Sequence, residues 1–172
     1  MKKLLMTVAI LATGATAFGN VSAPVSVSLD VVTTSNLVLM EGANQLNQID
    51  LTHKQIIMTV AQGTTAPSTA SKTFTAQTGD DSAIKFNGQE GATITYSFAG
   101  TGANGKLELT NGKETLDSTL ALSSTEHKVA AGSTSASANT ITSTIAPMAL
   151  NGILTEGTYT GAATLNVILA VL

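Results

Sequence analysis

The sequence contains no cysteine, no arginine and no tryptophan, and only 11% of its 172 residues are charged. Without cysteine no disulfide and no lipid-modified cysteine is available, so stability must come from packing and hydrogen bonds. The shortage of basic side chains argues against a nucleic-acid partner, because lysine and arginine supply the phosphate contacts. It equally disfavours docking on anionic lipid.

No apolar run reaches the roughly 20 residues that a membrane-spanning helix requires. Residues 4–12 come nearest, between the basic start Met1–Lys3 and the small-residue triplet Ala15–Ala17. This layout is typical of a secretory signal peptide, with a retained membrane anchor as the alternative. We therefore expect a signal peptide over residues 1–17 and a mature chain of 172 − 17 = 155 residues, with 8 − 2 = 6 lysines against 11 acidic residues.

Serine, threonine, alanine and glycine dominate the remainder, and apolar residues recur in short alternating runs. A period of two places alternate side chains on one face of a strand. Turn residues separate the runs every ~8–12 residues, and no helical pattern appears after residue 17, which predicts an all-β, immunoglobulin-like sandwich. We expect a loop over residues 64–71 and strands over residues 37–40, 55–60, 72–76, 83–86, 92–98, 107–109, 116–122, 127–130, 140–145 and 158–172.

The clearest alternation lies at the start of the mature chain, over residues 21–32. No Asn-Gly or Asp-Gly step follows it, so no tight hairpin is expected there. Its partner strand then lies elsewhere in the chain or in another molecule; an ordinary first strand of a sandwich is the alternative. The apolar side chains on its one face are Val21, Ala23, Val25, Val27, Leu29 and Val31.

A second long alternation ends the chain, after a turn at Glu156-Gly157. It predicts a strand that continues to the last residue. Its apolar face carries Tyr159, Ala163, Leu165, Val167 and Leu169.

The segment Gly100–Lys106 satisfies G-x-G-x-x-G and nearly matches a phosphate-binding loop. Both motifs require a helix directly after the loop, because the helix N-terminus meets the phosphate. A strand-like alternation follows instead, and Leu107 stands where a serine or threonine would bind the metal ion. We therefore predict a turn and no nucleotide cofactor.

No constellation of catalytic or metal-binding residues is apparent. His53 and His127 are the only histidines and lack the spacing of metal ligands, and no G-x-S-x-G motif accompanies them. We expect both to be solvated, Asp80-Asp81 to form a turn rather than a calcium site, and most of the six aromatic residues to lie in the core. The sequence thus predicts no enzyme, no cofactor and no metal site.

With its alternating N-terminal arm, its lack of cysteine and the ending E-G-T-Y-T-G-A-A-T-L-N-V over residues 156–167, the chain resembles chaperone–usher fimbrial subunits. It is most similar to the cysteine-free pilins of the common pilus and colonization-factor type. The S-N-L-V-L step at residues 35–39 is also similar. Two features depart from many pilins: Val171 replaces a next-to-last aromatic residue, and the single disulfide is missing.

The resemblance implies a donor-strand arm over residues 18–35 and, over residues 36–172, a pilin sandwich that lacks its last strand. Residues 158–169 would flank an acceptor groove, which a periplasmic chaperone fills first and the arm of the next subunit fills later. Strand addition of this kind caps an exposed sheet edge. Because the arm is then a central strand, Pro24 should lie at its start, where its missing N–H matters least.

The function that this resemblance implies is structural. Exported through the periplasm, the subunit would polymerise head to tail into a surface fimbria used in adhesion or biofilm formation. Its partners would be further copies of itself, the chaperone, an outer-membrane usher and a host receptor. The alternative is a tip adhesin or minor subunit of the same fibre, although neither a second domain nor a groove of exposed aromatic residues is visible in the sequence.

Overall fold

A computed structural model describes residues 21–33, 37–59, 64–65, 68–79, 91–147 and 157–171. The predicted signal peptide, the Asp80-Asp81 turn and the predicted strand over residues 83–86 lie outside these ranges. Within them, no helix is long and apolar enough to cross a membrane.

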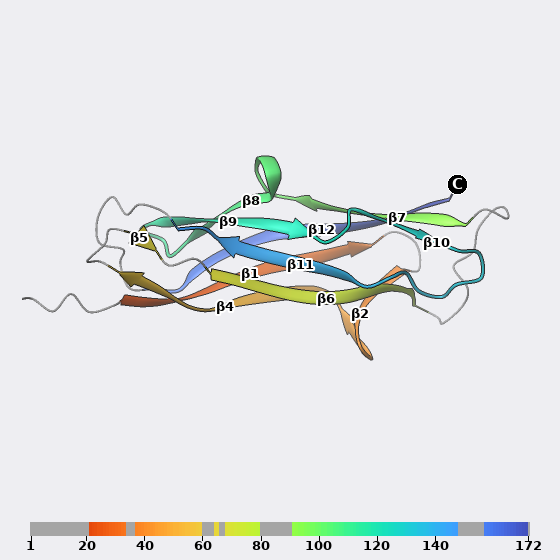
Figure 1. Ribbon diagram of the computed structural model, residues 1–172, viewed down its shortest axis with the longest axis horizontal. Coiled ribbons are helices and arrows are strands. Elements are labelled where there is room, and N and C mark those ends of the chain that lie inside the picture. Colours follow the sequence, from red (N-terminus) through yellow and green to blue (C-terminus); the bar gives the residue numbers. More distant parts are fainter. Residues whose placement is uncertain are drawn as a thin grey trace, which may run out of the picture.

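The described chain is almost entirely β-structure, which confirms the all-β prediction (Figure 1). Its one helical element there is a short 3-10 turn at Ala103–Gly105. The strands are β1 (Val21–Thr33), β2 (Leu37–Glu41), β3 (Asn44–Leu46), β4 (Gln48–Thr59), β5 (Thr64–Thr65), β6 (Ser68–Thr78), β7 (Ala92–Ala99), β8 (Lys106–Thr110), β9 (Thr115–Leu122), β10 (Glu126–Val129), β11 (Asn139–Ile145) and β12 (Tyr159–Val171).

The loop predicted over residues 64–71 is wrong in part. β5 occupies Thr64–Thr65, and β6 already begins at Ser68. The first residues of β6 pair with the end of β11, from Ser68 opposite Ile145 to Ser71 opposite Thr142. Backbone pairing with a distant strand therefore outweighs the weak strand preference of this small-residue segment.

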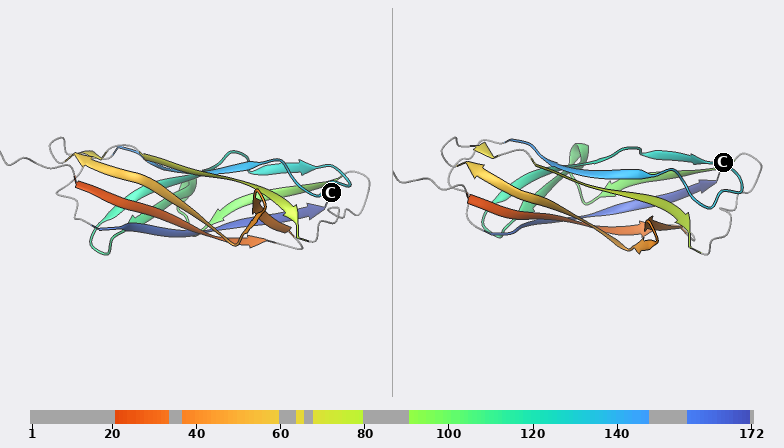
Figure 2. Two further views of the ribbon diagram at one scale, coloured as in Figure 1. Left: turned by 90° about the horizontal axis from the view of Figure 1, so that it is seen from below. Right: turned by 60° about the horizontal axis from the view of Figure 1, so that its bottom comes forward.

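The strands form one continuous, elongated and strongly curved sheet (Figures 1 and 2). Its order is β3-β2-β6-β11-β9-β8-β12-β1-β4-β5, and β7 pairs with both β12 and β10. The curvature brings β4 next to β6, although no backbone pairing joins these two strands in the described chain. β1 is thus a central strand, with a partner on each side.

The inward side chains of the curved sheet form a single core. Phe74, Tyr96 and Tyr159 are at most 2% exposed, as expected for aromatic residues on inward faces. The rings of Phe74 and Tyr96 meet edge to face, with centroids 5.8 Å apart. Most of the remaining core is aliphatic and comes from alternate positions of nearly every long strand.

Candidate functional site

The strand β1 fills a slot between the last strand and β4. It runs parallel to β12, from Val25 opposite Tyr159 to Thr33 opposite Val167. On its other side it runs antiparallel to β4, from Val21 opposite Met58 to Asp30 opposite Gln48. Of the two partners left open by the sequence, the structure therefore places β1 against its own chain. Figure 2 shows β1, β4 and β12 side by side along the length of the molecule.

The inward face of β1 is fully packed. Val25 is 1% exposed, Val27 and Leu29 are 0% exposed, and Val31 is partly buried against the same core. Burial of an aliphatic side chain contributes about 1.5–3 kcal/mol, so the three fully buried residues together contribute roughly 4.5–9 kcal/mol before ordering costs. The side chains of Val21 and Ala23 lie outside the described set, but their backbones pair with Met58 and Ile56.

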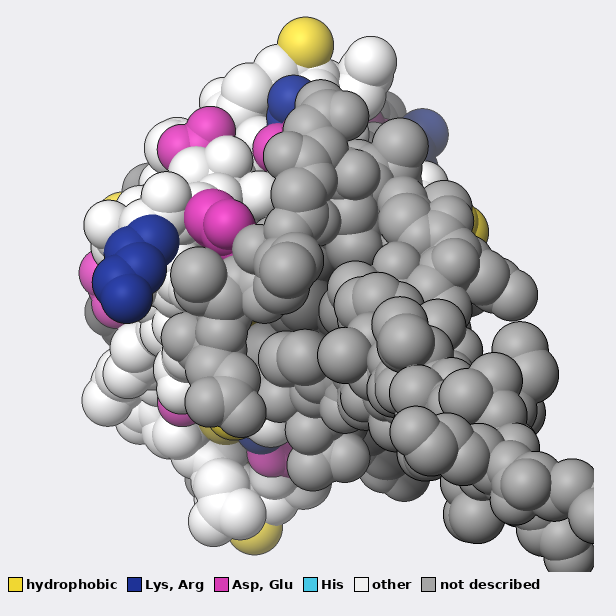
Figure 3. Space-filling view, turned by 90° about the vertical axis from the view of Figure 1, so that its left-hand side faces the viewer, with side chains coloured by type: hydrophobic (Ala, Val, Ile, Leu, Met, Phe, Trp, Pro, Cys, Tyr) yellow, Lys and Arg dark blue, Asp and Glu magenta, His cyan; other side chains and the backbone are white. Residues whose placement is uncertain are grey.

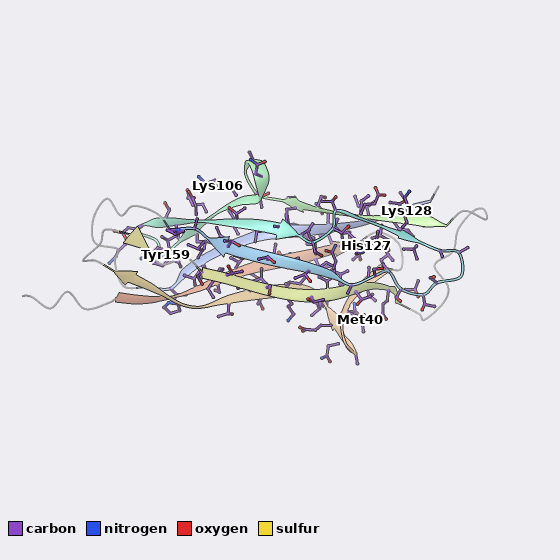
Figure 4. The ribbon with its side chains drawn as sticks, viewed as in Figure 1. Met40, Lys106, His127, Lys128 and Tyr159 are labelled. Carbon is purple, nitrogen blue, oxygen red and sulfur yellow. The ribbon has the colours of Figure 1, made fainter. Side chains whose placement is uncertain are left out.

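The facing strand β12 carries its own buried row. Tyr159, Leu165 and Val167 are 0% exposed, Ala163 is 7% exposed and Leu169 is partly buried. These are the five residues that the alternation assigned to one face. The hydroxyl of Tyr159, the first residue of β12 and labelled in Figure 4, donates a hydrogen bond to Glu114 Oε2 at 3.2 Å.

Gly161 interrupts this row and lies directly opposite Val27. A Cβ atom at this position would lie 2.5 Å from Leu109 Cδ2 and 3.0 Å from the carbonyl oxygen of Glu108. The absence of a side chain therefore lets β8 approach β12 closely and lets Leu109 occupy the space that a Cβ atom at position 161 would need. The sequence revealed this glycine in the G-T-Y-T-G spacing, but not its steric role.

Pro24 is exposed and lies at the point where the pairing register between β1 and β4 shifts. Ala23 pairs with Ile56 and Val25 pairs with His53, so the register shifts between them. A bulge at the beginning of a central strand accommodates proline because no ladder hydrogen bond is then required of its nitrogen.

Hydrogen bonds between polar groups join the outward face of β1 to β4 and the residue before it. Ser28 Oγ donates to Asp50 Oδ1 at 3.0 Å and also accepts a hydrogen bond from Gln48 Nε2. The backbone N–H of Val31 donates to the carbonyl of Asn47 at 3.0 Å. β4 is therefore the second flank of the slot. The sequence predicted a strand only over residues 55–60 and missed residues 48–54, although Ile49, Leu51 and His53 alternate there with Asp50 and Thr52.

The Gly100–Lys106 segment is a turn, as predicted. Asn104 and Gly105 adopt positive φ angles of 58° and 74°, and β8 follows directly. A Cβ on Gly105 would lie 2.2 Å from the carbonyl oxygen of Leu120, which explains this glycine without any ligand. Lys106, labelled above β8 in Figure 4, is paired with Asp117 at 2.8 Å.

The prediction that both histidines are solvated is wrong for His53. Its ring is 2% exposed; Nε2 lies 2.8 Å from Ser143 Oγ and Nδ1 lies 3.0 Å from Ser68 Oγ. The Ser143–His53 pair has the spacing of a nucleophile and its base. Ser143 is 0% exposed, however, and both ring nitrogens contact serine hydroxyls, so no carboxylate of the described residues orients the ring.

His127 lies on β10 beside Lys128 (Figure 4) and is partly exposed. Its Nδ1 is 3.3 Å from the hydroxyl of Tyr96, and the two rings meet edge to face. Burial raises the pKa of Tyr96 to about 12, so this phenol remains neutral and can act as a donor.

At the end of the molecule seen in Figure 3, lysine and acidic side chains are scattered among uncharged ones. Within the described residues, no three histidine or acidic side chains gather into a possible metal site. No known family model matches this sequence, and comparison with curated proteins gives no significant match.

Proposed function

We propose that this chain is a structural subunit that polymerises by transferring β1 to the slot of a neighbouring copy. In this proposal residues 36–172 form an immunoglobulin-like sandwich that is incomplete without an added strand. The self-inserted arm is the state of an isolated subunit. The assembled state is a surface fimbria built by donor-strand exchange, in which the subunit catalyses nothing.

The observation that carries this proposal is the position of β1. It is the first described strand, it lies centrally between β12 and β4, and its inward side chains are at most 1% exposed from Val25 to Leu29. Only the short connection over residues 34–36 joins it to the next strand, β2. In this proposal the signal peptide over residues 1–17 is removed, so that β1 lies at the start of the mature chain and can leave its slot while the rest of the chain keeps its order.

Exchange between identical copies costs little contact energy. An arm inserted into a second copy can make the same apolar contacts that it makes in its own chain, as in domain swapping. Removal without replacement would expose a row of apolar side chains and two unpaired strand edges, which promotes aggregation. A strand supplied by a periplasmic chaperone would serve as the temporary cover during export.

Head-to-tail exchange favours a fibre over a closed pair. Each copy offers one arm and one slot, and these are different surfaces. A heterologous contact of this kind generates an open filament whenever its rotation does not close into a ring. The few basic side chains and the many hydroxyl groups of the sequence fit an extracellular structural role, because nucleic acid and anionic lipid are bound mainly through lysine and arginine.

The test is a reversible lock on β1. Ser26 and Thr52 are register partners on β1 and β4, and their side chains point away from the core. Antiparallel partners have Cα atoms about 4.5–5.5 Å apart, which suits a disulfide. In a chain without other cysteines, the oxidised Ser26→Cys/Thr52→Cys variant is expected to form no fibres in electron micrographs. Reduction should restore them.

The matched control is Thr73→Cys/Thr140→Cys, which joins register partners on β6 and β11 and leaves β1 free. This variant should assemble equally well in its oxidised and reduced forms. Thiol titration establishes that each disulfide has closed. If the locked arm polymerises as readily as this control, strand exchange is not the assembly mechanism.

A further inference from the structure

A row of four hydrogen-bonded polar side chains crosses the core beneath β1. It runs from Ser68 on β6 through the ring of His53 on β4 to Ser143 on β11, and on to Ser118 on β9. The two serine hydroxyls at its far end are 2.6 Å apart, and both side chains are at most 1% exposed. One imidazole thus connects strands from both sides of the curved sheet.

This row of side chains bridges β4 and β6, the two neighbouring strands between which the curved sheet is not closed by backbone pairing. β4 and β6 lie side by side without a ladder in the described chain, and the His53–Ser68 hydrogen bond crosses between them. His53 is also the register partner of Val25. The hydrogen bonds of its ring therefore hold β4, the strand that pairs with one edge of β1, in place.

The neutral ring satisfies this environment completely. A neutral imidazole has one donor and one acceptor nitrogen, and a serine hydroxyl can serve either one. Among the described side chains, no buried polar atom lacks a partner. A protonated ring would donate from both nitrogens, which the two hydroxyls can also accept, so protonation costs desolvation of a cation rather than a hydrogen bond.

No described carboxylate is placed to compensate that cation. On β1 Asp30 is exposed, and on β4 Asp50 is exposed and bonded to Ser28. On β9, Asp117 pairs with Lys106 at the surface. On β6 the charged group is Lys72, which is paired with Glu41. β11 carries no ionisable side chain, and its inward residues beside Ser143 are Ile141 and Ile145.

We propose that His53 makes the closed fold sensitive to acid. When neutral, its ring holds β4 against β6 and β11 through the hydrogen bonds to Ser68 and Ser143. When protonated, it destabilises these contacts and so loosens the slot of β1. This device belongs to the single chain and does not depend on fibre formation. It would make release of the arm easier in mildly acidic surroundings than at neutral pH.

The direction of the pH effect follows from burial, which lowers the pKa of His53 from its ordinary value of 6.5. Above pH 6.5 neither the folded nor the unfolded chain holds the proton, so stability does not change through this residue. As the pH falls below 6.5, the unfolded chain binds a proton that the folded chain resists, and stability declines. The decline ends once the pH passes the lower pKa of the folded state.

The experiment measures urea unfolding of the full chain from pH 7.5 to pH 4.5 in wild type, His53→Gln and His127→Gln. One proton linked to unfolding multiplies the unfolding equilibrium constant by about ten for each pH unit. Wild type and His127→Gln should show this rise below pH 6.5 in addition to the contribution of the carboxylates. His53→Gln should be less stable at pH 7.5 but lack the additional rise, whereas a slope equal to that of wild type would overturn the proposal.

Direct titration covers the case in which His53→Gln does not fold. In His127→Gln the remaining histidine ring resonance belongs to His53, because the chain has two histidines. This ring should titrate at a lower pH in the folded protein than in the same protein unfolded in urea, because burial lowers the pKa of His53. A folded ring that titrates at the same pH as the unfolded one, or at a higher pH, would overturn the proposal.

Discussion

Val27→Asp is expected to lower the free energy of unfolding by on the order of 4 kcal/mol and to abolish the proposed assembly into fibres. The side chain of Val27 is 0% exposed and lies at the middle of β1. The substitution loses about 1.5–3 kcal/mol of apolar burial. It also buries a carboxyl group without a hydrogen-bond partner, and the desolvation of that group costs about 1–3 kcal/mol or more. Urea denaturation measures the first effect, and electron microscopy the second.

Ser26→Asp is the matched control, because it adds the same group one residue earlier on the outward face. Its effect on stability should remain within about 0.5 kcal/mol, as for most surface substitutions. Leu29→Asp should behave like Val27→Asp, since Leu29 is also 0% exposed. Equal losses in all three variants would contradict the register of β1, whichever molecule supplies its slot.

Gly161→Val is expected to destabilise the protein by about 3 kcal/mol, the upper part of the usual range for overpacking. Its first added carbon would lie 2.5 Å from Leu109 Cδ2 and 3.0 Å from a backbone oxygen of β8. The leucine side chain can move, but the backbone of β8 cannot yield without disturbing its pairing with β9. The midpoint of urea denaturation should fall accordingly.

Ala162→Val serves as the control, because Ala162 is exposed on the opposite face of β12. A β-branched side chain suits such a strand position, so the stability should change little. A loss as large as that of Gly161→Val would indicate that β12 tolerates no added volume, rather than that β8 requires the glycine.

The strands themselves were largely predictable, because alternation is a local property. The runs at Leu37–Met40 and Ala92–Phe98 became β2 and β7, and the two long alternations at the chain ends became β1 and β12. Their partners were not predictable. The parallel pairing of β1 with β12 joins segments more than 130 residues apart, and a period of two specifies which face is buried but not which edge is paired.

His53 shows why a single polar residue resists prediction. Within the run from Ile49 to His53 it occupies the inward parity, but it was expected to be solvated because it lacks the spacing of a metal ligand or a catalytic motif. Its burial depends on hydroxyls from Ser68 and Ser143, which only the folded chain brings together. The same holds for Gly161, whose reason lies in the close approach of β8.

The parallel arrangement of β1 and β12 has a mechanical consequence. Val21 begins β1 at one end of the molecule and Val171 ends β12 at the other. Tension between these two points loads the nine register pairs of this ladder in shear, so they resist together instead of opening one after another. We therefore expect the folded chain to withstand stretching along its long axis far better than peeling across it.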